Sequence, residues 1–87
     1  MSCERYQILF TKQAQKEICK LTPKLKSKLK DILRHKIAVV PQSGKRLVGD
    51  LTGYYSVRLS FQDRIVYRIE SEHCLVLIVR EKSHYGE

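Results

Sequence analysis

The spacing of apolar residues changes its period once along this chain. In the first half the spacing is helical, because apolar side chains recur every three or four positions in two stripes: Ala14, Ile18 and Leu21, then Leu25, Leu29, Ile32 and Leu33. Thr11 and Thr22 precede the stripes as candidate N-cap residues, and Pro23 takes the first helical position after Thr22. The pattern predicts a helical hairpin, preceded by a short strand over residues 6–10.

In the second half the period becomes two, which is typical of a half-buried strand. The predicted core face of this β-hairpin comprises Tyr55, Val57, Leu59, Phe61, Ile65, Tyr67 and Ile69. Its other face carries Arg58, Arg64 and Arg68. Residues 74–79 are apolar throughout, as expected of an interior strand that is covered on both faces.

These elements follow the order β-α-α-β-β-β, with no repeat or linker between them. A chain of 87 residues is the size of one small domain, so we expect a single domain over residues 1–87. Helices grouped early and strands grouped late predict an α+β fold. In this fold the N-terminal helical hairpin packs on one face of an antiparallel sheet.

The chain is strongly basic, with a formal net charge of +8. Residues 12–36 contain nine Lys or Arg and two acids, so the helical hairpin holds +7 of this charge. A basic shell of this kind suits sequence-independent contact with a phosphate backbone, although a solvated solubility face is the simpler alternative. We therefore expect an acidic partner: nucleic acid, an acidic protein or an anionic membrane surface.

Several kinds of protein are disfavoured by the sequence. No apolar run approaches the ~18–20 residues of a membrane span, and no signal peptide is visible. Cys3, Cys19 and Cys74 are odd in number and far apart, which predicts neither a disulfide framework nor a zinc site. We expect each of them to be a small core or surface residue in a reducing compartment, which favours the cytoplasm.

The chain also lacks the short motifs of common enzymes: it has no glycine-rich phosphate loop, no H-E-x-x-H and no G-x-S-x-G. His35, His73 and His84 fall on different elements, with no cysteine pair beside them. Any chemistry is therefore expected to be acid–base catalysis without a metal or cofactor. The available parts are strand arginines, whose planar forks hold phosphate, and the His84-Tyr85 pair.

Three stretches resemble motifs of one family. Residues 51–59, LTGYYSVRL, resemble an L-x-G-x-[WY]-x-x-R strand, and residues 63–68, DRIVYR, resemble an R-[LIV]-V-Y strand. His84-Tyr85 resembles the H-Y ending of the YoeB and Txe branch. In this order, on a small basic chain, the stretches resemble the RelE/ParE superfamily of bacterial toxin–antitoxin toxins, and most closely its YoeB/Txe-like branch.

The resemblance implies a function. Members of that branch are mRNA interferases, which enter the ribosomal A site and cut the message, and an acidic antitoxin neutralises them. By position, Arg64 resembles the arginine that stabilises the phosphate in the transition state, His84 the proton-transfer residue, and Tyr85 the tyrosine that orients or assists it. The positions implied for phosphate binding are Lys45, Arg46, Arg58 and Lys82.

The sequence also departs from the family patterns. YoeB-like members carry an acid near the position of Lys45, and RelE-like members carry lysines where this chain has Ser56 and Arg58. The general base is therefore not assigned. The main alternative function is that of the ParE branch, whose members inhibit DNA gyrase without nuclease activity. A non-catalytic RNA-binding domain is less favoured, because Tyr55, Phe61 and Tyr67 are predicted on apolar faces.

Overall fold

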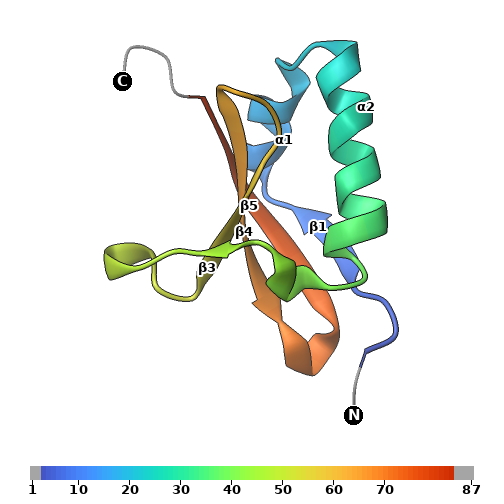
Figure 1. The fold of residues 1–87 in the computed structure, drawn as a ribbon, viewed down its shortest axis with the longest axis vertical. Coiled ribbons are helices and arrows are strands. Elements are labelled where there is room, and N and C mark those ends of the chain that lie inside the picture. The colour runs from blue at the N-terminus through green and yellow to red at the C-terminus, as the bar shows by residue number, and fades with distance from the viewer. Residues whose placement is uncertain (1–2, 84–87) are drawn as a thin grey trace.

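The computed structural model describes residues 3–83, which form a five-stranded sheet with two helices packed on one of its sides (Figure 1). The strand order is β1-β5-β4-β3-β2. The elements are β1 (Gln7–Phe10), α1 (Lys12–Cys19), α2 (Pro23–Ile32), β2 (Lys45–Arg46), β3 (Tyr54–Arg58), β4 (Asp63–Glu70) and β5 (Leu75–Ser83). The predicted α+β class and the helical hairpin are confirmed.

Two features of the sheet differ from the prediction. β2 is a two-residue edge strand in a segment for which no strand was predicted. β1 pairs with β5 in parallel, whereas the other three pairings are antiparallel. A parallel pair needs a long crossover, and here the intervening helices and strands supply it. Among the described residues, no helix is long and apolar enough to cross a membrane.

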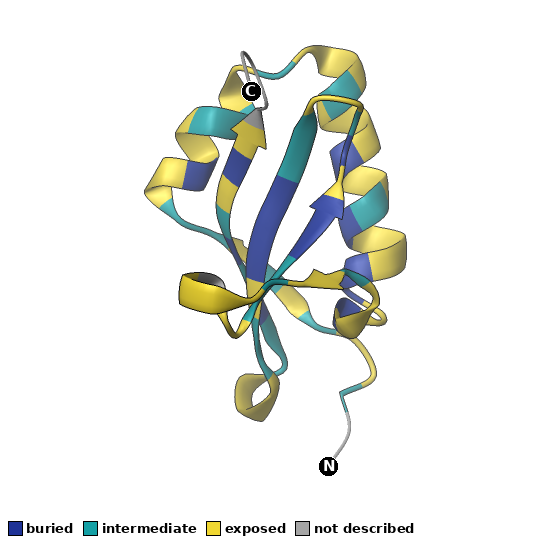
Figure 2. Ribbon diagram, turned by 60° about the vertical axis from the view of Figure 1, so that its left-hand side comes forward, coloured by how far each residue is buried: buried dark blue, intermediate teal, exposed yellow. Residues whose placement is uncertain are grey.

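Both helices begin at the predicted caps. The Thr11 hydroxyl accepts a hydrogen bond from the Ala14 amide (3.0 Å), and the Thr22 hydroxyl accepts one from the Leu25 amide (3.2 Å). A cap of this kind typically contributes about 1 kcal/mol to helix stability. After α2 the chain continues into a π-helical turn, Leu33–Ile37. The buried sides of the helices face the sheet, and their outer sides are exposed (Figure 2).

Tyr67 lies at the centre of the core and is fully buried. Its hydroxyl donates a hydrogen bond to the Pro41 carbonyl (2.6 Å), its ring stacks on Tyr55, and burial raises its pKa to about 12. A side chain at Gly44 would overlap the Tyr67 hydroxyl and lie 2.9 Å from the Ser56 carbonyl oxygen. Glycine at position 44 therefore lets β2 approach the sheet.

The turn between β3 and β4 corrects one prediction. Phe61 was expected on the core face, but it is 91% exposed. β3 ends at Arg58, and the turn is closed by a hydrogen bond from the Leu59 amide to the Asp63 carbonyl (2.8 Å) and another from the Ser60 hydroxyl to the Asp63 carboxylate (2.8 Å). These polar contacts interrupt the alternation, so Phe61 projects from the turn.

β5 lies between β1 and β4, which confirms the prediction of an interior strand. The prediction that both faces are covered is wrong, because Val76 and Ile78 are buried under the helices while Leu77 on the other face is only half-buried. The strand also contains a bulge. Val66 pairs with Arg80 and Tyr67 with Ile78, so the residue between them on β5, Val79, has no partner.

The cysteine prediction is wrong for two of the three residues. Cys3 and Cys74 form a disulfide, with their Cα atoms 5.7 Å apart, whereas Cys19 is free and exposed. The parallel pairing explains this contact, because Gln7 opposite Leu75 places the segments that precede β1 and β5 side by side. The cysteines therefore give no argument for a reducing compartment.

Removing this crosslink should destabilise the oxidised protein. Cys3→Ser opens a covalent loop with a sequence separation of 71 residues, and loss of a disulfide typically costs about 2–4 kcal/mol. For a domain of this size we expect the Tm to fall by at least about 8 °C. Thermal unfolding with and without a reductant measures the effect. Equal Tm values for wild type and variant under oxidising conditions would contradict the prediction, and Cys19→Ser is the matched control.

Candidate functional site

Three cations form a row across the side of the sheet opposite the helices. Arg58 on β3 lies directly opposite Arg64 on β4, and Arg64 lies directly opposite Lys82 on β5. The residues next to these cations along the strands point to the other side of the sheet, toward the helices. These residues, Val57, Ile65 and Glu81, are buried. The prediction that strand arginines share one face is therefore confirmed for Arg58 and Arg64.

β2 adds a fourth cation to this row. Lys45 pairs with Ser56, which is on the same face of β3 as Arg58. Lys45, Ser56, Arg58 and Arg64 line one cavity of about 140 Å³, which has room for a phosphate group. The bulge brings Arg80 to this side as well, opposite Val66. We call the surface that carries Lys45, Arg58, Arg64, Arg80 and Lys82 the basic face.

The row is electrostatically unfavourable by itself. Like charges that face each other across strands destabilise a sheet. Among residues 3–83, no carboxylate lies within ion-pair distance of Lys45, Arg58, Arg64 or Lys82. An anion bound in the cavity relieves this repulsion, and guanidinium forks hold phosphate oxygens by paired hydrogen bonds. The arrangement is therefore suited to bind phosphate.

The remaining predicted site residues are placed differently. Arg46 pairs with Tyr55, which packs on the core, and does not line the cavity. Arg68, on the same strand as Arg64, is ion-paired with Glu70 (2.8 Å). His84 and Tyr85 lie outside the described residues, and they follow Ser83, the last residue of β5.

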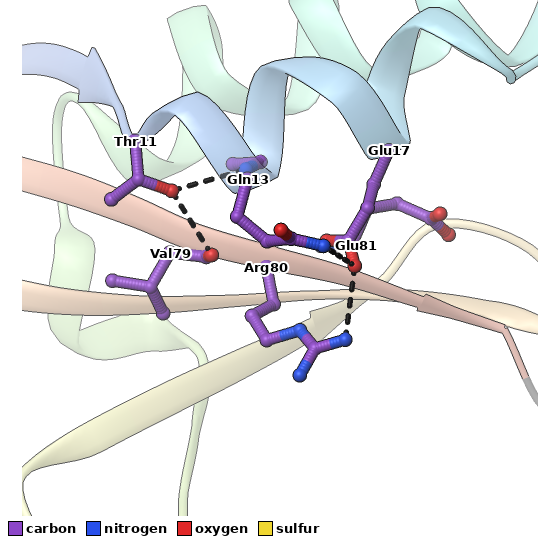
Figure 3. A network of polar contacts seen from close by, with 7 residues as sticks. Thr11, Gln13, Glu17, Val79, Arg80 and Glu81 are labelled. Atoms are coloured by element: carbon purple, nitrogen blue, oxygen red, sulfur yellow. Dashed lines mark hydrogen bonds and ion pairs between the residues drawn. The ribbon is translucent and has the colours of Figure 1, made fainter.

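A polar network that no sequence pattern indicated lies at the edge of the basic face (Figure 3). The Glu17 carboxylate of α1 accepts hydrogen bonds from the Arg80 guanidinium (3.0 Å), the Gln13 amide group (3.0 Å) and the Glu81 backbone amide (2.9 Å). Burial by itself raises the pKa of Glu17, but the hydrogen bonds and the Arg80 charge outweigh it and lower that pKa. Glu17 and Arg80 are 63 positions apart, so no local pattern could reveal the pair.

Glu81 was also missed, because the bulge turns it toward the helices. It is 8% exposed, and its Oε2 atom is buried without a hydrogen-bond partner among the described residues. Burial, then the hydrogen bond and charge of Asp63 and the charge of Glu17, raise its pKa to about 7. Because its side chain points toward the helices, Glu81 does not line the phosphate-sized cavity.

No group of three or more metal-ligating side chains within residues 3–83 is arranged to hold a metal ion.

Glu81 should make the protein less stable as the pH rises. Its pKa is about 7 in the folded state against an ordinary 4.5, so the folded protein binds the extra proton between these values and loses this stabilisation toward pH 7. Glu81→Gln, which stays neutral at every pH, should raise the free energy of unfolding at pH 8 on the order of 2 kcal/mol. It should change little at pH 4.

Thermal unfolding of wild type and Glu81→Gln at both pH values tests this expectation. The exposed Glu72 lies in the turn before β5, so Glu72→Gln is the control and should leave the pH dependence unchanged. A Glu81→Gln protein whose Tm follows that of wild type at every pH would show that the carboxyl does not titrate in this range.

Comparison with solved structures identifies the fold. A chain of the RelBE2 toxin–antitoxin complex from Mycobacterium tuberculosis is 30% identical, with a TM-score of 0.82 over 92% of each chain. A chain of the YoeB–YefM complex from Staphylococcus aureus is 31% identical, with a TM-score of 0.65 over 93% of this chain and 99% of that one. For the intact RelBE complex from E. coli these values are 25%, 0.76, 90% and 95%.

A helical hairpin on a five-stranded sheet, with cations on its open side, defines a protein of the RelE-like fold. At this level of identity and coverage the relationship extends beyond the fold: the chain belongs to the RelE/ParE superfamily of toxins, as its sequence motifs predicted. No protein-family model and no curated protein sequence matches the chain.

Proposed function

We propose that this chain is the toxin of a type II toxin–antitoxin system and that it cuts mRNA in the ribosomal A site. The observation that carries the proposal is the row Arg58, Arg64 and Lys82 beside a cavity that no carboxylate neutralises among the described residues. A protein that acts only by binding gyrase has no need of a phosphate-sized cationic cavity. Because ribosomes are the proposed target, the proposed location of the protein is the cytoplasm.

RNA carries its own nucleophile, so the enzyme needs no cofactor for the proposed reaction. The 2′-hydroxyl gives up its proton as its oxygen attacks the adjacent phosphorus, the bond from phosphorus to the 5′-oxygen breaks, and the leaving 5′-oxygen takes up a proton. The products are a 2′,3′-cyclic phosphate and a 5′-hydroxyl. Arg64 stabilises the additional negative charge on the phosphoryl oxygens, and Arg58, Lys45 and Lys82 position the phosphate.

Proton transfer is assigned to His84. Guanidinium groups do not exchange protons near neutral pH, so Arg58 and Arg64 do not serve this step. An ordinary imidazole has a pKa of about 6.5 and is suited to protonate the leaving 5′-oxygen. His84 is two positions after Lys82 in the sequence, and Tyr85 follows to orient the imidazole or the phosphate.

The proposed partner is a small acidic antitoxin that covers the basic surface. All three related structures above are complexes, and those of RelBE2 and RelBE are toxin–antitoxin complexes. The net charge of +8 provides the electrostatic complement for an acidic protein. A pull-down from the host with the purified chain should capture such a protein.

Cleavage of a defined message on programmed ribosomes tests the proposed function. Primer extension should map new 5′ ends inside the A-site codon, and these ends should carry a 5′-hydroxyl. Substituting a 2′-deoxy nucleotide at the mapped position should abolish the cut, because the nucleophile is absent. If the message stays intact and the protein instead blocks supercoiling by DNA gyrase, the proposal is wrong and the ParE-like alternative holds.

A further inference from the structure

A second and larger cavity opens on the basic face, next to the phosphate-sized one. Its volume is about 450 Å³, within the range typical of small-ligand sites. It is lined by Thr11, Gln13, Tyr54, Val66, Val79, Arg80 and Lys82. The proposed reaction, as described above, assigns no role to this cavity.

The lining has two chemical characters. Val66 and Val79 offer an apolar surface, and the aromatic ring of Tyr54 is half-buried beside them. Arg80 and Lys82 are exposed and add positive charge. A nucleobase combines a flat apolar ring with a nearby phosphate, and it stacks on aromatic side chains whatever its identity.

The cavity is continuous with the cationic row. Lys82 lines the cavity and lies directly opposite Arg64, which lines the phosphate-sized cavity. Val66 is two positions from Arg64 on the same face of β4. A strand whose phosphate is held by Arg64 therefore has its adjacent base within reach of Tyr54 and the two valines.

Hydrogen bonds connect the residues along one wall of the cavity (Figure 3). The Thr11 hydroxyl donates to the carbonyl of Val79 (3.2 Å), which joins the start of α1 to the bulge. Glu17 holds both Arg80 and Gln13, at 3.0 Å each. These contacts place Gln13 and Arg80 at the rim of the cavity before a ligand binds.

We infer that this cavity binds one nucleobase of the RNA strand, packed against Tyr54 and the Val66–Val79 surface, beside the phosphate held by Arg64 and Lys82. The inference rests on the proposed function for its ligand. It assigns Tyr54, Gln13 and Arg80 a role in holding a base near the cut, separate from the chemical step.

Binding of two oligonucleotides of equal charge tests the inference. One is a mixed-sequence decamer of 2′-O-methyl RNA, which cannot be cut because its nucleophile is blocked, and the other is an abasic decamer with the same backbone. Wild type should bind the base-bearing decamer about tenfold more tightly, the effect of one stacked base. Tyr54→Ala should bring this ratio close to one.

Two further variants and a control complete the experiment. Val79→Phe places a bulky side chain in the cavity and should lower the same ratio. It serves as the test variant if thermal unfolding shows that Tyr54→Ala does not fold. Phe61→Ala removes an aromatic side chain that is 91% exposed and lies outside the cavity, and it should keep the wild-type ratio. A ratio that stays at wild type in folded Tyr54→Ala and Val79→Phe overturns the inference, as does loss of the ratio in Phe61→Ala alone.

The outcome is separable from that of the proposed function. If wild type cuts the message on ribosomes while Tyr54→Ala keeps the base-dependent ratio, the nuclease stands and the base site falls. If the message stays intact while the ratio depends on Tyr54, the base site is supported, but the protein binds RNA without cutting it. If wild type binds neither decamer, the base site is refuted whatever the cleavage result.

Discussion

Arg64→Ala should lower ribosome-dependent cleavage about 10²–10³-fold, the usual effect of removing one donor that stabilises transition-state charge. Arg64 lines the phosphate-sized cavity and lies between Arg58 and Lys82. The variant removes one of three repelling charges, so its Tm should not fall. Single-turnover cleavage of a defined message, with thermal unfolding alongside, measures both quantities.

Arg68→Ala is the matched control for Arg64. Both arginines lie on the same face of β4, but Arg68 is ion-paired with Glu70 and lies outside the cavity. It should cut at nearly the wild-type rate. Equal losses from Arg64→Ala and Arg68→Ala would show that the assay reports general charge rather than the site.

Two variants at the end of the sequence test proton transfer. His84→Ala and Tyr85→Ala should each lower the rate sharply, because a general acid or base typically contributes about 10²–10⁴-fold. Arg58→Ala should have an intermediate effect on the rate, since Arg58 positions the phosphate and transfers no proton. Wild-type cleavage by both His84→Ala and Tyr85→Ala would remove these residues from the active site.

Affinity for ribosomes or RNA should fall by orders of magnitude between ~50 and ~200 mM salt, if roughly six or more phosphates are contacted. All nine Lys and Arg of residues 12–36 are exposed, and they form a separate basic surface on the helical side of the molecule. Replacing Lys24, Lys26 and Lys28 by Gln should reduce the slope of log K against log salt. An affinity that does not change with salt would contradict this expectation.

The same titration on a control variant separates charge from other effects. His73 lies in the turn before β5, and its imidazole is 3.7 Å from the Glu70 carboxylate. His73→Gln should leave the salt slope unchanged. If the lysine variant and the control show the same slope, the helical charge is a solubility feature and not a binding surface.

Local signals explain which parts of the fold could be predicted. Thr11 and Thr22 each cap the helix that follows them. A period of two over residues 54–61 and 64–70 predicted the β-hairpin, which the structure forms with β3 and β4. The wrong predictions involve contacts that no window of sequence contains. The Cys3–Cys74 disulfide depends on parallel pairing, and the exposure of Phe61 depends on how Asp63 closes a turn.

The same distinction applies to the site. Alternation placed Arg58 and Arg64 on one face because each is on a regular strand. Lys45 reaches the cavity because β2 pairs with β3, and a two-residue strand is too short to show a pattern in the sequence. A bulge at Val79 reverses the alternation for the end of β5, so Arg80, Lys82 and buried Glu81 exchange the faces that a regular strand would give them.

The pairing of β1 with β5 also determines when the sheet can form during synthesis of the protein. Gln7 faces Leu75, so the ribosome must add 68 further residues after Gln7 before the first of these contacts can form. β5 is also the strand that brings Lys82 beside Arg64. A nascent chain that has not yet released β5 lacks both an interior strand of the sheet and the complete row of cations. The basic face is therefore assembled only after β5 has left the ribosome that makes the chain.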